Sequence, residues 1–146
     1  MVNAAFINTD NMVHYTRDLV KFEIVSRTPD LVGSVGRLHY SQNGRSYVME
    51  DRMLEAEPGK RYLSQVSGEA LEATVETTFA PVGRGTGMTM RWSGKGRVLL
   101  LKLLMPLMRG RMTREATAEL ETFKRLVEAR GADFSKRPGS GAIGQL

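Results

Sequence analysis

The chain has 146 residues, of which 41% are hydrophobic and 25% are charged, and its formal net charge is +5. These values exclude a disordered chain and a membrane-embedded chain, and they indicate one soluble globular domain. The absence of cysteine excludes disulfides and thiolate chemistry. Any metal site would depend on two histidines and on carboxylates, and we expect no metal and no cofactor.

The positive charge is concentrated near the C-terminus. Lys and Arg number 10 against 11 Asp and Glu in residues 1–94, and 11 against 5 in residues 95–146. Such a basic segment could attract phosphates or an anionic membrane surface. No recognition motif accompanies it, so we expect a solvated helix face and no DNA binding. The sequence offers no support for peripheral membrane contact.

The N-terminal residues, MVNAAFINTDNMVHY, lack the basic start and the apolar core of a signal peptide. We therefore expect a cytoplasmic protein. Thr9 or Asp10 is predicted to cap a short helix that carries Met12, Val13 and Tyr15.

Turn signals at hairpin spacing divide the next part of the chain. The strongest is Asn43-Gly44, because both residues tolerate the positive φ that a two-residue hairpin turn needs. Pro58-Gly59, Ser67-Gly68 and 83–85 are further signals. The sequence predicts an antiparallel meander with strands at residues 19–27, 35–42, 45–56, 60–66, 70–80 and 86–93.

The last two strands alternate between apolar and polar residues. Residues 71–79 place Leu71, Ala73, Val75 and Phe79 on one face, and Met88, Met90 and Trp92 follow the same rule. Both apolar faces should point toward whatever covers the sheet.

A long helix is predicted to provide that cover. Its apolar stripe follows helical spacing, and Gly131 is a candidate C-cap. The remaining segment, SKRPGSGAIGQL, has the composition of a flexible tail. We predict one domain over residues 1–131 and a flexible tail over residues 132–146. The stripe consists of Met108, Met112, Ala116, Leu120, Phe123 and Val127.

The segment before this helix, RVLLLKLLMPLMRG, is too short for a membrane span. Pro106 fits the first turn of a helix, which predicts an apolar lead-in followed by the helix start. The leucines must be covered, either as a lid over a pocket or in a homodimer contact.

Several phrases resemble the START-related polyketide cyclase/dehydrase and lipid transport superfamily, SRPBCC. They are VGSVGRLHY, LEAEPGKRYLSQVSG, ETTFAPVGRGTGMTMRW and the closing RMTREATAELETFKRLVEARG. The resemblance covers about residues 5–131. It implies an α+β helix-grip fold, in which a curved antiparallel sheet wraps a long C-terminal helix around an apolar cavity. Members usually begin with a strand before the first helix, whereas VNAAFINTDNMVHYTRDLV resembles the helical region that follows that strand. Either the start therefore lies upstream, or residues 1–8 serve as a strand.

This resemblance implies a binding site for a small hydrophobic or amphipathic ligand, such as a lipid, a quinone or a polyketide-like molecule. Methionine suits such a wall because its side chain adapts to irregular apolar surfaces. The predicted lining residues are Met49, Met53, Tyr62, Val75, Phe79, Met88, Met90, Trp92, Met108, Met112, Leu120 and Phe123.

Two alternatives remain open. One is a cyclase/dehydrase-type enzyme that uses His39, Tyr47 and Asp51 as an acid/base set. The other is an interaction module whose basic helix docks on a membrane surface or on RNA. Neither the G-x-S-x-G motif nor the H-E-x-x-H motif occurs, so hydrolase and zincin chemistry have no support.

Overall fold

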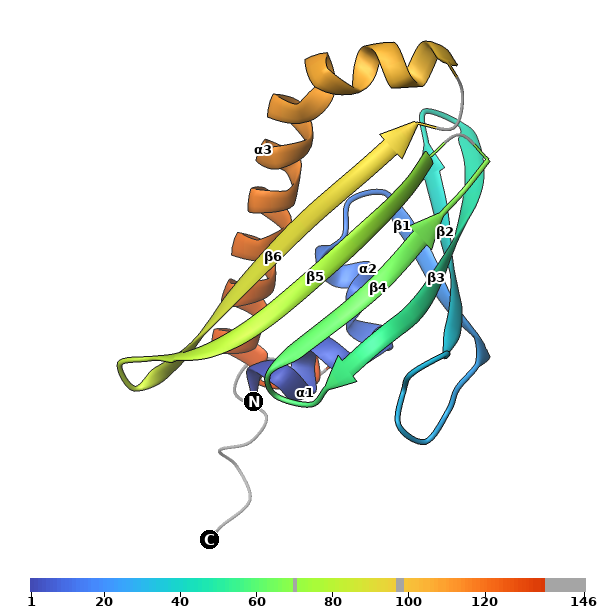
Figure 1. Ribbon diagram of the computed structural model, residues 1–146. Coiled ribbons are helices and arrows are strands. Elements are labelled where there is room, and N and C mark those ends of the chain that lie inside the picture. Colours follow the sequence, from blue (N-terminus) through green and yellow to red (C-terminus); the bar gives the residue numbers. More distant parts are fainter. Residues whose placement is uncertain (70, 97–98, 136–146) are drawn as a thin grey trace, which may run out of the picture.

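The computed structural model describes residues 1–69, 71–96 and 99–135, and it describes side chains in these ranges except for residues 95–109. Six antiparallel strands form one sheet in the order β1-β2-β3-β4-β5-β6 (Figure 1). Every strand pairs with its neighbours in the sequence, as a meander requires. The strands are β1 Leu19–Ser26, β2 Val35–Gln42, β3 Arg45–Glu57, β4 Arg61–Ser67, β5 Leu71–Val82 and β6 Gly85–Gly96.

Turn chemistry sets the register of this sheet. Asn43 has φ 51° and Gly44 has φ 76°, so the predicted two-residue turn joins β2 to β3. Gly59 and Gly83 also have positive φ, at 77° and 57°, and they close the next hairpins. The predicted strand boundaries agree with the observed ones to within a few residues, because these signals are local.

The helix α3, Leu99–Arg130, begins seven residues before Pro106. Our prediction that the helix starts at Pro106 was therefore wrong. Figure 1 shows that the first part of α3 turns sharply away from the direction of the remainder. Proline has no N–H group and its ring clashes with the preceding turn of a helix, so a proline inside a helix favours a bend. Pro106 lies inside α3 and does not start it. The leucine side chains of this segment lie outside the described residues, and the choice between lid and dimer contact stays a prediction.

The N-terminal residues form helices and not a strand. Val2–Ile7 is α1, Thr9–Asn11 is a single 3-10 turn, and Met12–Tyr15 is α2. Asn8 caps the 3-10 turn, because its Oδ1 accepts a hydrogen bond from the backbone N–H of Asp10 at 3.2 Å. The N-cap position of α2 is Asn11, which makes no side-chain capping bond, so the prediction that Thr9 or Asp10 caps this helix was wrong. Residues 1–8 therefore do not replace a missing first strand, and β1 and β6 are the two edges of the sheet.

The helices cover the concave face of the sheet at one end (Figure 1). Ala5, Phe123, Val127 and Phe134 form a buried cluster there, against which Phe6 and Met88 pack. The ring of Phe6 also contacts the rings of Tyr62 and Phe79 at 5.4 and 5.6 Å. This closed end joins both termini of the domain to the sheet. Among the described residues, no helix has an apolar run long enough to cross a membrane.

Asn11 is the buried polar group at the closed end. Its Nδ2 donates hydrogen bonds to the carbonyls of Ala5 at 3.0 Å and Ala132 at 2.9 Å. Its Oδ1 accepts one from the backbone N–H of Phe134 at 3.0 Å, and the side chain of Phe134 is completely buried. The folded domain therefore extends past the predicted boundary at residue 131, because residues 132–134 are held by Asn11. Residues 136–146 of the predicted tail lie outside the described residues.

The variant Asn11→Ala should lose about 3 kcal/mol of unfolding free energy, because three buried backbone groups would lose their partner. Urea denaturation followed by circular dichroism measures this change. Asp10→Ala, at the exposed neighbouring position, should change stability by about 0.5 kcal/mol or less. Equal effects of the two substitutions would contradict the role assigned to Asn11.

Candidate functional site

The strand register sorts the predicted polar residues onto two faces. Tyr40 pairs with Tyr47, and His39 pairs with Val48 on the opposite face. The Nε2 atom of His39 lies 2.9 Å from Oε2 of Glu23 on the neighbouring edge strand. Hydrogen bonding with His39 lowers the pKa of Glu23. His39 is therefore held on the convex face and does not converge with Tyr47 and Asp51.

Three tyrosines lie on the concave side of the sheet, where the prediction had placed His39. The rings of Tyr40 and Tyr47 stack, with centroids 4.9 Å apart and planes inclined by 12°. Tyr15, the last residue of α2, packs edge-on against Phe123 of α3 with centroids 4.9 Å apart. We call these three residues the tyrosine end of the concave face.

Asp51 lies on the same face, on β3. In the strand register Asp51 pairs with Gly36 of β2. The ring of Phe22 covers Gly36, and a Cβ atom at position 36 would lie only 2.3 Å from Cζ of Phe22. Burial in these surroundings raises the pKa of Asp51 from its ordinary value of 3.8 to about 6, although hydrogen bonding with Ser64 opposes the shift. The side chain of Asp51 is half-buried, so part of its surface remains accessible.

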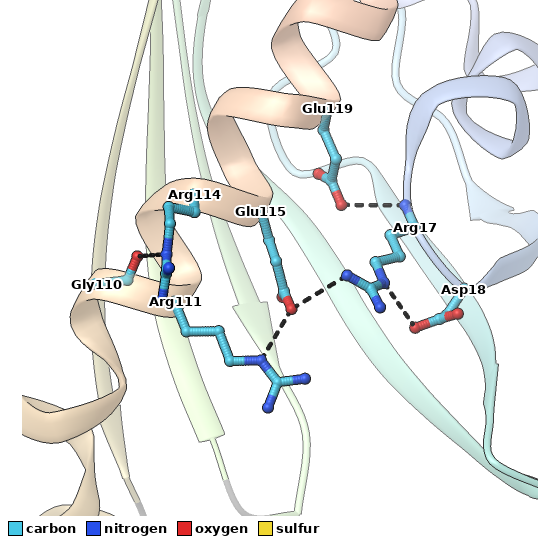
Figure 2. Close-up of polar contacts among 7 residues, drawn as sticks. All are labelled: Arg17, Asp18, Gly110, Arg111, Arg114, Glu115 and Glu119. Atoms are coloured by element: carbon cyan, nitrogen blue, oxygen red, sulfur yellow. Dashed lines mark hydrogen bonds and ion pairs between the residues drawn. The ribbon is translucent and has the colours of Figure 1, made fainter.

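Glu119 faces the tyrosine end from α3. Its Oε1 accepts a hydrogen bond from the backbone N–H of Arg17 at 3.0 Å (Figure 2). Burial nevertheless raises the pKa of Glu119, because it outweighs that hydrogen bond. The carboxylate of Glu115, one turn earlier, accepts hydrogen bonds from Arg17 Nη1 at 3.4 Å and Arg111 Nε at 3.1 Å. These contacts fix α3 to the segment between α2 and β1.

These groups form one electrostatic cluster. Burial raises the pKa of Tyr15 and Tyr40, and the carboxylates of Glu119 and Asp51 raise both further. Both phenols therefore stay protonated at neutral pH and can donate hydrogen bonds. No hydrogen bond joins either phenol to another described residue in the structure, so both are free to serve a bound molecule. We call Tyr15, Tyr40, Asp51 and Glu119 the inner polar cluster.

A hollow of about 240 Å³ lies between α2 and α3, beside this cluster, and its walls include Tyr15, Arg17, Glu115 and Glu119. A larger hollow of about 470 Å³ lies along the edge strand β6, and it is lined by Leu63, Thr74, Glu76, Arg91, Trp92 and Ser93. Most of this lining belongs to the convex face, where Arg61 forms an ion pair with Glu76 at 2.7 Å, and Trp92 reaches the hollow from the edge of the sheet. We therefore place the candidate site on the concave face, where the titratable groups with strongly raised pKa values gather.

The predicted apolar lining residues differ in how far they are buried. Tyr62, Phe79 and Phe123 are buried in the closed end, where the hydroxyl of Tyr62 donates a hydrogen bond to Oδ1 of Asn3. Trp92, on the same concave face, keeps 39% of its surface exposed. The side chain of Met108 lies outside the described residues. The half-buried members are Met49, Met53, Val75, Met88, Met90, Met112 and Leu120.

Tyr15, Tyr40 and Glu119 were not among the predicted site residues. Strand alternation could have revealed Tyr40, because it shares a face with the buried Leu38. Helical spacing could have revealed Glu119, four residues before Phe123 on the apolar stripe. Among the described residues, no group of three His, Asp or Glu side chains could hold a metal ion.

No protein-family model matches the chain, and no curated protein matches its sequence significantly. Solved structures do match. Protein CV1439 from Chromobacterium violaceum is 16% identical with a TM-score of 0.67, and the match covers 87% of each chain. A START superfamily protein from Mycobacterium smegmatis is 14% identical with a TM-score of 0.67, over 82% of this chain and 84% of that one.

Ara h 8.0201 is 12% identical with a TM-score of 0.61, over 84% of this chain and 88% of its own. These likenesses confirm the predicted α+β helix-grip fold of the START type. They also confirm the resemblance to the SRPBCC superfamily at the level of the fold. At these identities they establish the fold alone.

The buried carboxyl group of Asp51 should make stability depend on pH. Because its folded pKa is above its unfolded value, its contribution falls as pH rises from 3.8 to about 6 and stays low above that range. Asp51→Asn removes this cost, so we expect the variant to be more stable than the natural chain by about 2 kcal/mol at neutral pH. Below pH 3.8 the difference should disappear.

Denaturant titrations across this pH range measure the effect. Glu121→Gln, at an exposed position on α3, is the matched control and should follow the natural chain. A constant stability difference between Asp51→Asn and the natural chain at every pH would show that Asp51 does not titrate in this range.

Proposed function

We propose that this protein binds a small hydrophobic or amphipathic molecule, such as a lipid, a quinone or a polyketide-like compound, between the concave face of the sheet and α3. The observation that carries this proposal is the inner polar cluster. Its two phenols have no hydrogen-bond partner among the described residues, and its two half-buried carboxyl groups have one each. A partly buried polar group gains from a further hydrogen-bond partner. A ligand with an apolar body and a polar end would satisfy both kinds of surface.

The apolar part of the wall supports the same proposal. Val75, Met90 and Trp92 lie on adjacent strands of the concave face and keep accessible surface, although the closed end of that face is fully packed. Covering such residues with a ligand contributes about 25 cal/mol per Å² of apolar area before the entropic cost of binding. The site would need no cofactor to bind its ligand.

Binding is better supported than either alternative. The predicted acid/base set of a cyclase/dehydrase-type enzyme is divided between two faces of the sheet, because His39 pairs with Glu23 on the convex side. The second alternative, a basic helix that docks on a membrane surface or on RNA, is also weakly supported. Residues 110–135 contain five Lys or Arg and five Asp or Glu, and the side chains of Arg111 and Arg17 are paired with Glu115.

The only tryptophan of the chain provides the measurement. Because Trp92 lies on the concave face, a ligand that enters should change its fluorescence emission. A panel of fatty acids, alcohols, amines, quinones and sterols is titrated while Trp92 emission and the melting temperature are recorded. If no member of the panel changes either quantity, the proposal fails.

Filling the space beside Trp92 should weaken binding. Val75 pairs with Trp92 and is half-buried on the concave face, so Val75→Phe should raise Kd by about tenfold or more for any molecule that the panel identifies. Thr74→Phe, one residue away on the convex face, is the matched control and should bind normally. Equal loss in the two variants would place the ligand elsewhere.

A further inference from the structure

The groups that act on the tyrosine end are predominantly acidic. Glu119 and Asp51 both raise the pKa of Tyr15 and Tyr40. The pKa of Tyr47 is raised by burial and by two further carboxylates, Asp18 and Glu115. Asp51 and Glu119 therefore lie close enough to Tyr15 and Tyr40 to act on both phenols, and Tyr47, whose ring stacks on Tyr40, is acted on by Asp18 and Glu115.

The cations nearest to this cluster are already paired and point toward solvent. The guanidinium of Arg17 lies 3.4 Å from Glu115 and 3.8 Å from Asp18, and 60% of its side chain is exposed. The side chain of Arg111 is 67% exposed and lies 3.1 Å from the same Glu115 oxygen (Figure 2). Within the described part of the chain, Asp51 is hydrogen-bonded with Ser64 and has no cationic partner. Glu119 accepts a hydrogen bond from the backbone N–H of Arg17, and the charge of Arg17 also lowers its pKa, but burial has the larger effect and raises it.

The stacked rings of Tyr40 and Tyr47 are an independent feature at the same end. Aromatic faces carry a negative quadrupole potential and attract cations placed over the ring. Tyr47 is 43% exposed, so the stack is accessible from outside the core. Ring faces and carboxylates in one place form the combination that proteins use to hold ammonium groups.

We infer that the polar end of the ligand is a cation, an amine or a quaternary ammonium group, and that it lies against Tyr40, Tyr47 and the carboxylates of Asp51 and Glu119. This inference rests on the proposed function, because it names the chemical class of the molecule bound at the same site. A carboxylate or phosphate head group would meet like charges without a free cation to neutralise it. A positive head group would instead pair with two half-buried carboxylates.

The test compares three probes with the same alkyl chain: decylamine, decanol and decanoate. Each is titrated at neutral pH below its micelle concentration, and binding is followed by Trp92 emission and by displacement of the neutral dye Nile red. The amine should bind at least about tenfold more tightly than decanoate, with decanol between them. Because the chains are equal, the difference reports the head group.

Variants locate the head group. Asp51→Asn and Glu119→Gln should each weaken decylamine binding several-fold and leave decanol binding nearly unchanged. Glu121→Gln, exposed on the same helix, should leave all three affinities unchanged. Thermal melting confirms that each variant is folded before it is titrated.

Other results overturn the inference in distinguishable ways. If decanoate binds as tightly as decylamine or more tightly, the site is a general apolar pocket and the cationic head group is wrong, while the proposed function stands. If the amine preference persists in both carboxyl variants, the cation does not lie at this cluster. If none of the three probes displaces Nile red, the proposed function itself fails.

Discussion

The carboxamide of Asn11 is the contact on which the arrangement of the domain depends. It bonds to α1 on one side and to the segment after α3 on the other, so it joins residues 121 and 123 positions apart in the chain. This contact closes the ends of the domain over one end of the sheet, where Tyr15 also packs against Phe123 and Phe134, and Tyr40 and Tyr47 lie on the concave face beyond it. The candidate site is therefore closed by packed apolar side chains at one end and carries its polar groups next to that closed end.

Much of the fold could be predicted because its signals are local. Asn43-Gly44 and the alternation from Leu71 to Phe79 depend only on residues near each other in the sequence, and the structure contains both. At the N-terminus, the family resemblance indicated a helical region over residues 2–20, and the structure has its short helices there. The alternative that residues 1–8 serve as a strand was wrong, because Val2, Ala5 and Phe6 have the i, i+3, i+4 spacing of a helix and pack at the core cluster.

The site was less predictable because it is assembled from distant segments. Tyr15 comes from α2, Asp51 from β3 and Glu119 from α3, and no local pattern indicates that they meet. His39 was chosen for its chemistry, but the face of a strand on which a residue lies decides which groups it can reach. Its neighbour Tyr40 has the opposite orientation, so a shift of one residue separates a hydrogen bond on the convex face from the candidate site.

The meander topology has a consequence for how the site forms during folding. Each strand pairs with its neighbour in the sequence, so forming the sheet brings together residues that are separated by short loops. The contact between Asn11 and Phe134 instead brings together residues at almost opposite ends of the chain. We therefore expect the β2–β3 hairpin, with Tyr40, Tyr47 and Asp51, to form early. Tyr15 and Glu119 should join it only when the helices dock, so the ligand-binding surface would be completed at the last step of folding.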